Sequence, residues 1–212
     1  MGHGSDPASI RLDGGHLALD FVNTVGGLRD GPPDRDSEAF TSYENLLVWC
    51  RRVGVLSSRQ ASSLKRAAGE REAEARRALS KALALRDLCY AIFRALAEGH
   101  RPRRALLDRL RDADRKALAH ARLVAADGAL RWSFAEAGEL SAPLWPLAHA
   151  AVELLTQGPL GRLRVCANCR WLFLDRSRNR SRRWCSMDGC GADIKKERFV
   201  ERRRRRLAAR RG

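Results

Sequence analysis

Two pairs of cysteines near the C-terminal end place the strongest constraint on what this chain can fold into. Cys166 and Cys169 are separated by two residues, and Cys185 and Cys190 follow after an interval of fifteen residues. A two-residue gap lets both thiolates of a tight turn face one ion, and Asn168 suits the left-handed backbone that such turns often need. Four sulfur ligands complete a tetrahedral shell and leave no position for a catalytic water. The spacing therefore predicts one structural zinc ion, Zn2+, bound by these four cysteines.

A redox dithiol is the main alternative for a single Cys-x2-Cys pair. Two pairs at finger spacing, without the strand and helix pattern of a thioredoxin, favour zinc. In a reducing cytosol, clustered cysteines are also more often metal ligands or redox groups than structural disulfides. Cys50 and Cys89 lie on apolar faces of helical segments, so we interpret them as small buried hydrophobic residues.

The residues between and after the pairs predict a small finger fold. Residues 171–174 form an apolar stretch typical of one arm of a β-hairpin. Gly189 and Gly191 allow a sharp turn into a helix from about residue 192. A knuckle, a hairpin and a helix carrying the last ligand is the order of a treble-clef finger. Such a module buries too little surface to fold alone, so the metal would supply about 10 kcal/mol of its folding free energy.

Upstream of the cysteines, the apolar periodicity predicts a mostly helical domain. Residues 70–98 carry apolar side chains around much of a helix surface, which is typical of a helix buried at the centre of a bundle. Ser57 and Gln60 form a capping-box pattern for a second helix. Further helices are predicted over residues 43–53, from about 102, and over 143–157.

Two stretches depart from the helical period. "GGHLALDFVNTVGG", residues 14–27, places Leu17, Leu19 and Phe21 on one face between turn residues and predicts a short strand. Residues 123–134 surround Asp127-Gly128, a strong hairpin signal. Gly158-Pro159 is the expected boundary between domains. The predicted fold class is mainly α (α+β), with a helical domain over 1–160 that includes a small β-hairpin, and a treble-clef-like zinc finger over 161–212.

Charge is concentrated at the same end of the chain as the cysteines. Residues 161–212 hold 18 Lys and Arg against 5 Asp and Glu, a net charge of +13, out of +16 for the whole chain. A cationic end of this density favours a polyanionic partner, because phosphates neutralised by a protein release their condensed counterions. A solvated basic tail is the alternative for a plain arginine run. The adjoining cysteine cluster favours a nucleic-acid-binding surface.

We predict that phosphate contacts come from the finger and from the helix after it. Arginines alternate with small polar residues over 176–182, which on an extended segment places guanidinium groups along one edge. The predicted nucleic-acid-binding residues are Arg170, Arg176, Arg178, Arg180, Arg182, Arg183, Lys195, Lys196, Arg198, Arg202 and Arg203.

Two segments resemble a known pair of modules. "VCANCRWLFLDRSRNRSRRWCSMDGCG" is similar to the CGNR zinc finger, and "LALDFVNTV" resembles the opening of the ABATE domain. The ABATE domain precedes that finger in a family of bacterial proteins ascribed to stress-induced transcriptional regulation. The resemblance covers about residues 12 to 206 and implies a mostly helical sensor-like domain, a structural zinc, and binding of double-stranded DNA by the finger.

The chain departs from the signature of this family at two positions. Where the signature reads Cys-Gly-Asn-Arg, this chain reads Cys190-Gly191-Ala192-Asp193. The change removes two donors and introduces repulsion toward phosphate at the start of the helix. We expect the zinc shell to survive, while the DNA contacts of these two positions are in doubt.

The resemblance also implies a small-molecule effector in the N-terminal domain. The candidate ligand-binding residues are Asp20, Asn23, Trp132, Trp145 and His149, because a few polar groups within apolar walls are typical of such sites. The alternative is that Asp20 and Asn23 satisfy backbone groups and that His149 is an ordinary helix-face histidine. Isolated polar residues more often have this structural role.

Other classes of function find little support in the sequence. The chain has no Gly-rich phosphate loop, no HExxH and no nucleophile elbow, so no enzyme activity is expected. It has no long apolar segment and no signal peptide at its start, so we expect no membrane association and a cytoplasmic location at the nucleoid. A homodimer is compatible with DNA binding, although no heptad pattern marks one.

Three hypotheses follow for function. The first is a DNA-binding transcriptional regulator whose N-terminal domain receives a signal. The second is an RNA-binding or ribosome-associated module, because cationic grooves with aromatic residues such as Trp171 and Trp184 also bind single strands. The third is a protein-interaction adaptor in which zinc holds a docking platform together.

Overall fold

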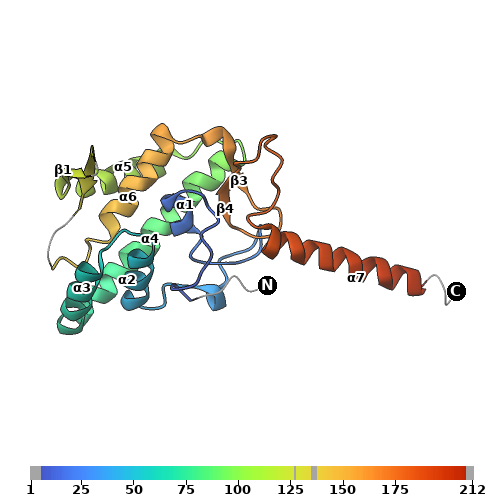
Figure 1. Ribbon diagram of the computed structural model, residues 1–212, viewed down its shortest axis with the longest axis horizontal. Coiled ribbons are helices and arrows are strands. Elements are labelled where there is room, and N and C mark those ends of the chain that lie inside the picture. Colours follow the sequence, from blue (N-terminus) through green and yellow to red (C-terminus); the bar gives the residue numbers. More distant parts are fainter. Residues whose placement is uncertain (1–5, 127, 135–137, 209–212) are drawn as a thin grey trace.

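A computed structural model describes residues 6–126, 128–134 and 138–208 of the chain. Helices dominate these residues, and the strands form two separate two-stranded antiparallel sheets, as Figure 1 shows. This arrangement confirms the predicted mainly α (α+β) class. The helices are α1 (Leu17–Val22), α2 (Tyr43–Arg52), α3 (Ser58–Glu70), α4 (Glu72–Ala97), α5 (Arg104–Ala119), α6 (Leu144–Gln157) and α7 (Ala192–Ala208), and the strands are β1 (Arg122–Ala126), β2 (Ala129–Ser133), β3 (Leu163–Val165) and β4 (Leu172–Leu174).

Helix α4 is the centre of the body. It packs against α1, α2, α3, α5 and α6, and also against both strands of the β3–β4 sheet. Small residues such as Ala78 and Ala82 alternate with Leu85, Ile92 and Phe93 on its buried surface. Close approach at the alanines lets several helices surround α4 at once, which explains the broad apolar coverage that predicted a central helix.

Two local predictions upstream of the finger are confirmed. Ser57 caps α3, with its hydroxyl accepting from the Gln60 N–H at 3.2 Å and its own N–H donating to the Gln60 side chain at 2.8 Å. Strands β1 and β2 form the predicted hairpin, in which Leu123 pairs with Trp132. Of the predicted turn, Gly128 has a φ of 74°, while Asp127 lies outside the described residues.

The predicted short strand around Leu17, Leu19 and Phe21 is wrong, because residues 17–22 form helix α1. The His16 imidazole accepts from the Ala18 N–H at 3.2 Å and caps the helix start. Ala18, Leu19, Phe21 and Val22 are all buried, so the helix is surrounded by protein rather than lying on a surface. The alternating pattern was misleading because nearly every position of this short helix faces the core.

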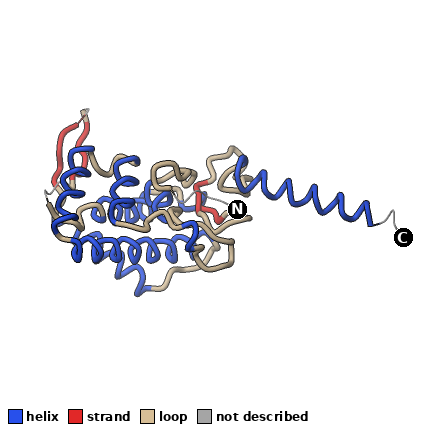
Figure 2. Tube along the Cα trace, turned by 90° about the horizontal axis from the view of Figure 1, so that it is seen from below, coloured by secondary structure: helices blue, strands red, loops and turns tan. Residues whose placement is uncertain are grey.

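The β3–β4 sheet shares one hydrophobic core with the helical body. Trp171, Leu172 and Phe173 have 0% exposure, and they join the same cluster of buried side chains as Phe21 and Trp49. Helix α7 is different, since it projects away from the body in both views (Figures 1 and 2). Its main contacts among the described elements are with the π-helical turn Met187–Gly191 that leads into it.

Candidate metal centre

The structure brings the four predicted ligands together. Cys166 follows β3 and Cys169 precedes β4, so the first pair forms the tip of this hairpin, while Cys185 and Cys190 belong to the segment that enters α7. All four sulfur atoms lie within 4.8 Å of one another and are buried. The Sγ atoms of Cys169 and Cys185 are 3.7 Å apart, as are those of Cys185 and Cys190.

These distances match the edge of a metal-centred tetrahedron. Four sulfurs at about 2.3 Å from one ion would be about 3.8 Å from each other. A disulfide requires a sulfur–sulfur distance of about 2.0 Å, and all six cysteines are free. The donor set and its size therefore fit a closed metal site.

Backbone hydrogen bonds shape the knuckle around the first pair. The Asn168 N–H donates to the Cys166 sulfur at 3.5 Å, and the Cys166 N–H donates to the Trp171 carbonyl at 2.9 Å. Ala167 donates to the Arg183 carbonyl at 2.9 Å and so links the knuckle to the segment that carries the second pair. The two sulfur pairs are thus positioned by the chain itself.

The π-helical turn Met187–Gly191 positions the last ligand. The Ser186 hydroxyl accepts from the Gly189 N–H at 3.0 Å, and the Gly191 N–H donates to the Ser186 carbonyl at 2.9 Å. This wide turn inserts one extra residue before α7 and directs Cys190 inward. The glycines predicted to allow a sharp turn therefore lie within it.

Contacts between the thiols shift the pKa values of Cys166 and Cys169 in opposite directions. The hydrogen bond from Cys169 lowers the pKa of Cys166 to about 6, and the same contact raises the pKa of Cys169. One thiolate therefore forms readily, and its charge opposes the next deprotonation. A divalent cation bound between the sulfurs would remove that opposition.

Residues 14–25 hold the metal hairpin on the body. The Asn23 side chain donates to the Leu172 carbonyl at 2.8 Å and accepts from the Leu172 N–H at 2.9 Å. The Trp171 indole donates to the Val25 carbonyl at 3.1 Å. Leu174 donates to the Gly14 carbonyl at 2.9 Å. Strand β4 thus has a neighbour on the side away from β3, although that neighbour is not a regular strand.

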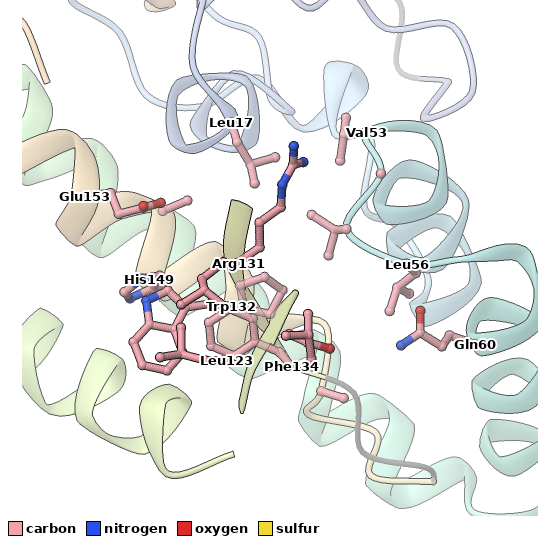
Figure 3. A pocket seen from close by; sticks show the side chains of 18 residues that line it. Leu17, Val53, Leu56, Gln60, Leu123, Arg131, Trp132, Phe134, His149 and Glu153 are labelled. Atoms are coloured by element: carbon pink, nitrogen blue, oxygen red, sulfur yellow. The ribbon is translucent and has the colours of Figure 1, made fainter. Parts of the chain in front are cut away.

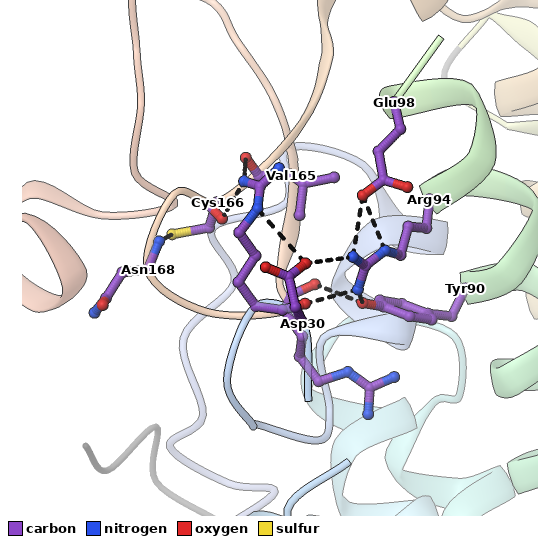
Figure 4. Close-up of polar contacts among 9 residues, drawn as sticks. Asp30, Tyr90, Arg94, Glu98, Val165, Cys166 and Asn168 are labelled. Atoms are coloured by element: carbon purple, nitrogen blue, oxygen red, sulfur yellow. Dashed lines mark hydrogen bonds and ion pairs between the residues drawn. The ribbon is translucent and has the colours of Figure 1, made fainter. Parts of the chain in front are cut away.

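A second set of contacts joins the knuckle to α4 through the loop after Val25 (Figure 4). Arg29 donates to the Cys166 carbonyl at 2.9 Å. Arg94 on α4 donates to the Arg29 carbonyl at 2.6 Å and pairs with Asp30 at 2.8 Å. Glu98 accepts from the same guanidinium at 3.0 Å. The knuckle therefore rests on a charged network that ends on the central helix.

Arg170 is not a surface residue, which corrects the prediction that it contacts nucleic acid. Its side chain is 4% exposed, and its guanidinium lies over the Tyr90 ring at 4.1 Å from the centroid. Its Nε and Nη1 atoms have no hydrogen-bond partner among the described residues. The guanidinium therefore packs against the Tyr90 ring of α4 instead of facing solvent.

Arg182 and Arg176 also serve the fold. Arg182 lies over the Phe173 ring at 4.6 Å, donates to the Trp184 carbonyl at 2.9 Å, and bonds to the Cys185 carbonyl. Arg176 is exposed but donates to the Gly15 carbonyl at 2.7 Å. These contacts account for two of the alternating arginines, because the segment is a folded loop rather than an extended edge.

The buried carboxylate of Asp175 shapes this loop. It accepts from the Ser177 N–H at 2.8 Å and from the Arg182 N–H at 3.0 Å. The Ser177 hydroxyl, together with these backbone bonds, lowers the pKa of Asp175 below its ordinary value, so the group stays ionised at neutral pH. Arg180 at the loop tip has a φ of 51°. The remaining predicted contact residues are exposed on this loop and on α7, namely Arg178, Arg180, Arg183, Lys195, Lys196, Arg198, Arg202 and Arg203.

Asp193, which replaces the signature arginine, lies in the first turn of α7. A carboxylate at this position interacts favourably with the positive end of the helix dipole. The structure therefore indicates that Asp193 stabilises the start of α7. Ala192 begins the helix and is exposed.

The five candidate ligand residues do not form one site. Asp20 accepts from the Gly14 N–H at 2.8 Å, and Asn23 is committed to Leu172, so both satisfy backbone groups. Trp145 stacks on His120 at 3.9 Å and lines a cavity of about 550 Å³ between α4, α5 and α6. Trp132 and His149 line a different cavity of about 710 Å³.

That larger cavity includes residues that the sequence reasoning missed. Arg131 extends into it from β2. Asp114 on α5 forms a hydrogen bond with His149, with a distance of 2.9 Å between Asp114 Oδ1 and His149 Nδ1. The sequence signal for Asp114 was weak, because a single acidic residue on an amphipathic helix normally faces solvent.

Among the described residues, no helix is long and apolar enough to cross a membrane.

Comparison with known families adds two matches. Residues 15–158 match the ABATE family, described as "Putative stress-induced transcription regulator". Residues 162–203 match the CGNR zinc finger. The two matches occur in the order expected from the sequence. No curated protein sequence matches the chain.

Proposed function

Because the chain belongs to the ABATE family and carries a CGNR zinc finger, we propose that it is a transcriptional regulator that binds double-stranded DNA. The observation that carries the proposal is the exposed cationic surface on the loop 176–183 and on α7. This surface is attached directly to the cysteine cluster. The proposal assigns no catalytic step to the chain.

Zinc is the metal that we propose for the cluster. Cys166, Cys169, Cys185 and Cys190 would hold it through four thiolates, and such a closed shell supplies a rigid crosslink rather than a site for water. The two sulfur pairs come from separate segments, the β3–β4 hairpin and the turn that leads into α7. Removal of zinc would therefore release the start of α7 from the hairpin.

Helix α7 has the dimensions and charge of a DNA-contacting element. Its 17 residues span about 26 Å, and they carry eight Lys and Arg against Asp193, Glu197 and Glu201. An isolated helix of this length is marginal in water, so a partner that neutralises its charge would also stabilise it. Phe199 is 60% exposed and Val200 40% exposed, which provides apolar contacts for thymine methyl groups in a groove.

The aromatic residues argue against single-stranded RNA as the main partner. Stacking platforms need exposed rings, whereas Trp171 is fully buried and Trp184 is half-buried beneath Arg183, whose guanidinium lies 5.5 Å from the ring centroid. Among the described residues of this surface, Phe199 on α7 is the exposed aromatic ring, and a single ring does not make a platform for successive bases. Duplex DNA, which is bound mainly through its phosphates, fits this surface better.

The test is duplex binding as a function of salt concentration. Fragments selected from genomic DNA by the zinc-loaded chain would be titrated by fluorescence anisotropy at several salt concentrations. With about six phosphates contacted, the logarithm of the binding constant should fall with a slope of about −5 against the logarithm of salt. Substituting both Lys195→Gln and Lys196→Gln should reduce the magnitude of that slope by about 1.8.

A matched control uses two exposed lysines on the helical body. Lys65→Gln with Lys81→Gln removes the same charge from α3 and α4, which lie outside the finger in the sequence. This variant should leave the salt slope of the binding constant unchanged. Preference for RNA over duplex DNA would support an RNA-binding module instead. Loss of all nucleic-acid binding near physiological salt would support an adaptor, and either result would refute the proposal.

A further inference from the structure

The cavity of about 710 Å³ is bounded by four parts of the helical body (Figure 3). Leu17 at the start of α1 and Val53 after α2 form one side, and α6 and the β1–β2 hairpin form the other. Its volume lies within the range of small-molecule sites, and most of the side chains that line it are apolar. The cavity does not touch the cysteine cluster or the cationic surface.

An aromatic cluster forms one end of this cavity. Trp132 meets the His149 ring edge-on at a centroid distance of 6.1 Å, and Phe134 lies 5.6 Å from the same ring. The buried carboxylate of Asp114, bonded to Nδ1 at 2.9 Å, fixes the orientation of the imidazole. Three rings from two elements are therefore held around one small space, which suits a flat apolar ligand.

Charged groups stand at the other end of the cavity. The Arg131 side chain extends from β2 toward Leu17 and Val53 in Figure 3, and Glu153 lies on the α6 wall. A guanidinium binds a carboxylate through two parallel hydrogen bonds, which orient the acid as well as hold it. The negative charge of Glu153 disfavours a carboxylate placed against α6.

We propose that this cavity binds a small aromatic carboxylic acid, with its ring against Trp132, Phe134 and His149 and its carboxylate on Arg131. A nucleotide would need several more phosphate-binding donors than the cavity offers. A neutral hydrocarbon would gain nothing from the guanidinium. An acid with an apolar ring satisfies both ends of the site.

Two walls of the cavity continue into the finger. Helix α1 begins at Leu17 in the cavity and ends at Val22, directly before Asn23, which bonds to β4. Helix α6 carries His149 and ends at Gln157, shortly before β3 begins at Leu163. A bound acid would thus contact α1, which packs on β4, and α6, which leads into β3. Its role as an effector rests on the proposed function, whereas its binding does not.

Isothermal titration calorimetry of the full zinc-loaded chain tests the binding directly. The probes are naphthalene-2-carboxylate, indole-3-acetate and 4-phenylbutyrate, with naphthalene-2-methanol as the neutral counterpart of the first. We expect at least one acid to bind with a Kd below about 1 mM. Arg131→Gln should weaken binding of that acid about tenfold or more, while binding of the neutral alcohol changes less than about twofold. Trp132→Ala should weaken both, because the ring contact is common to them.

Arg109→Gln provides the matched control, because Arg109 lines the separate cavity between α4, α5 and α6. It should leave every titration unchanged. The proposal is overturned if no acid binds, if the acid binds no better than the alcohol, or if Arg109→Gln weakens binding as much as Arg131→Gln. Because no DNA is present in these titrations, a negative result refutes this site alone, whereas an absent salt slope refutes the proposed function alone.

Discussion

Substitution of Asn23 by alanine should loosen the attachment of the metal hairpin to the helical body. Asn23 is 1% exposed, and both hydrogen bonds of its amide go to the backbone of Leu172 on β4. It therefore acts as a short substitute for a neighbouring strand. Alanine would leave the N–H and the carbonyl of Leu172 buried without these partners.

The size of the effect follows from the burial of these groups. A buried donor or acceptor that loses its partner costs about 1–3 kcal/mol, so the two groups of Leu172 together predict a loss of about 2–6 kcal/mol in the free energy of unfolding. Typical domains have only about 5–15 kcal/mol in total. The variant should fold at low temperature but unfold at clearly lower denaturant concentration.

Urea denaturation of the zinc-saturated protein, followed by circular dichroism, measures this free energy. Transfer of zinc to a chromophoric chelator measures the stability of the metal hairpin in the same samples, and should be faster in the variant. Asn179→Ala is the matched control, because Asn179 is exposed on the loop 176–183 and should change stability by less than about 0.5 kcal/mol. A loss below about 1 kcal/mol for Asn23→Ala would refute the role assigned to this amide.

Three further substitutions test other parts of the structure. Cys169→Ser should abolish stoichiometric zinc in elemental analysis and also reduce the near-ultraviolet circular dichroism of the body, because Trp171 belongs to the common core; retention of one zinc would contradict the ligand set. Burial raises the pKa of Asp20 to about 6, so the folded protein holds a proton there more tightly than the unfolded chain and loses stability as the pH rises from about 4 to about 6. Asp20→Asn should flatten that dependence in pH-resolved denaturation, and an unchanged profile would exclude Asp20 as its source. Arg86→Ala breaks the buried pair with Glu38, in which both bonds are 2.6 Å, and should cost about 3 kcal/mol in a thermal unfolding experiment, whereas an unchanged melting temperature would show that the pair is not stabilising.

The features that were predictable from sequence are those set by local spacing. The interval between Cys166 and Cys169 determines a knuckle wherever it occurs, and the Ser57 capping box depends on residues three apart. The long apolar surface of α4 was equally clear, because only a central helix buries so many sides. None of these features depends on a distant part of the chain.

The features that were missed depend on distant partners. Residues 17–22 read as a strand because the helix that they form is short and buried on nearly all sides, and its neighbours cannot be identified from its own residues. The burial of Arg170 requires Tyr90, which is 80 residues away. Gly158-Pro159 stays a predicted boundary between domains, whereas the core that β4 shares with the helical body depends on Phe21 and Trp49, far earlier in the chain.

The bond between Asn23 and Leu172 joins residues 149 positions apart, and this separation has a consequence for synthesis on the ribosome. Residues around Asn23 must wait until Leu172 has emerged before they meet β4. Until then Phe21 and its neighbours lack part of their covering, so a nascent chain halted before residue 172 would expose apolar surface to chaperones and proteases. Synthesis past this residue is what lets the interior close.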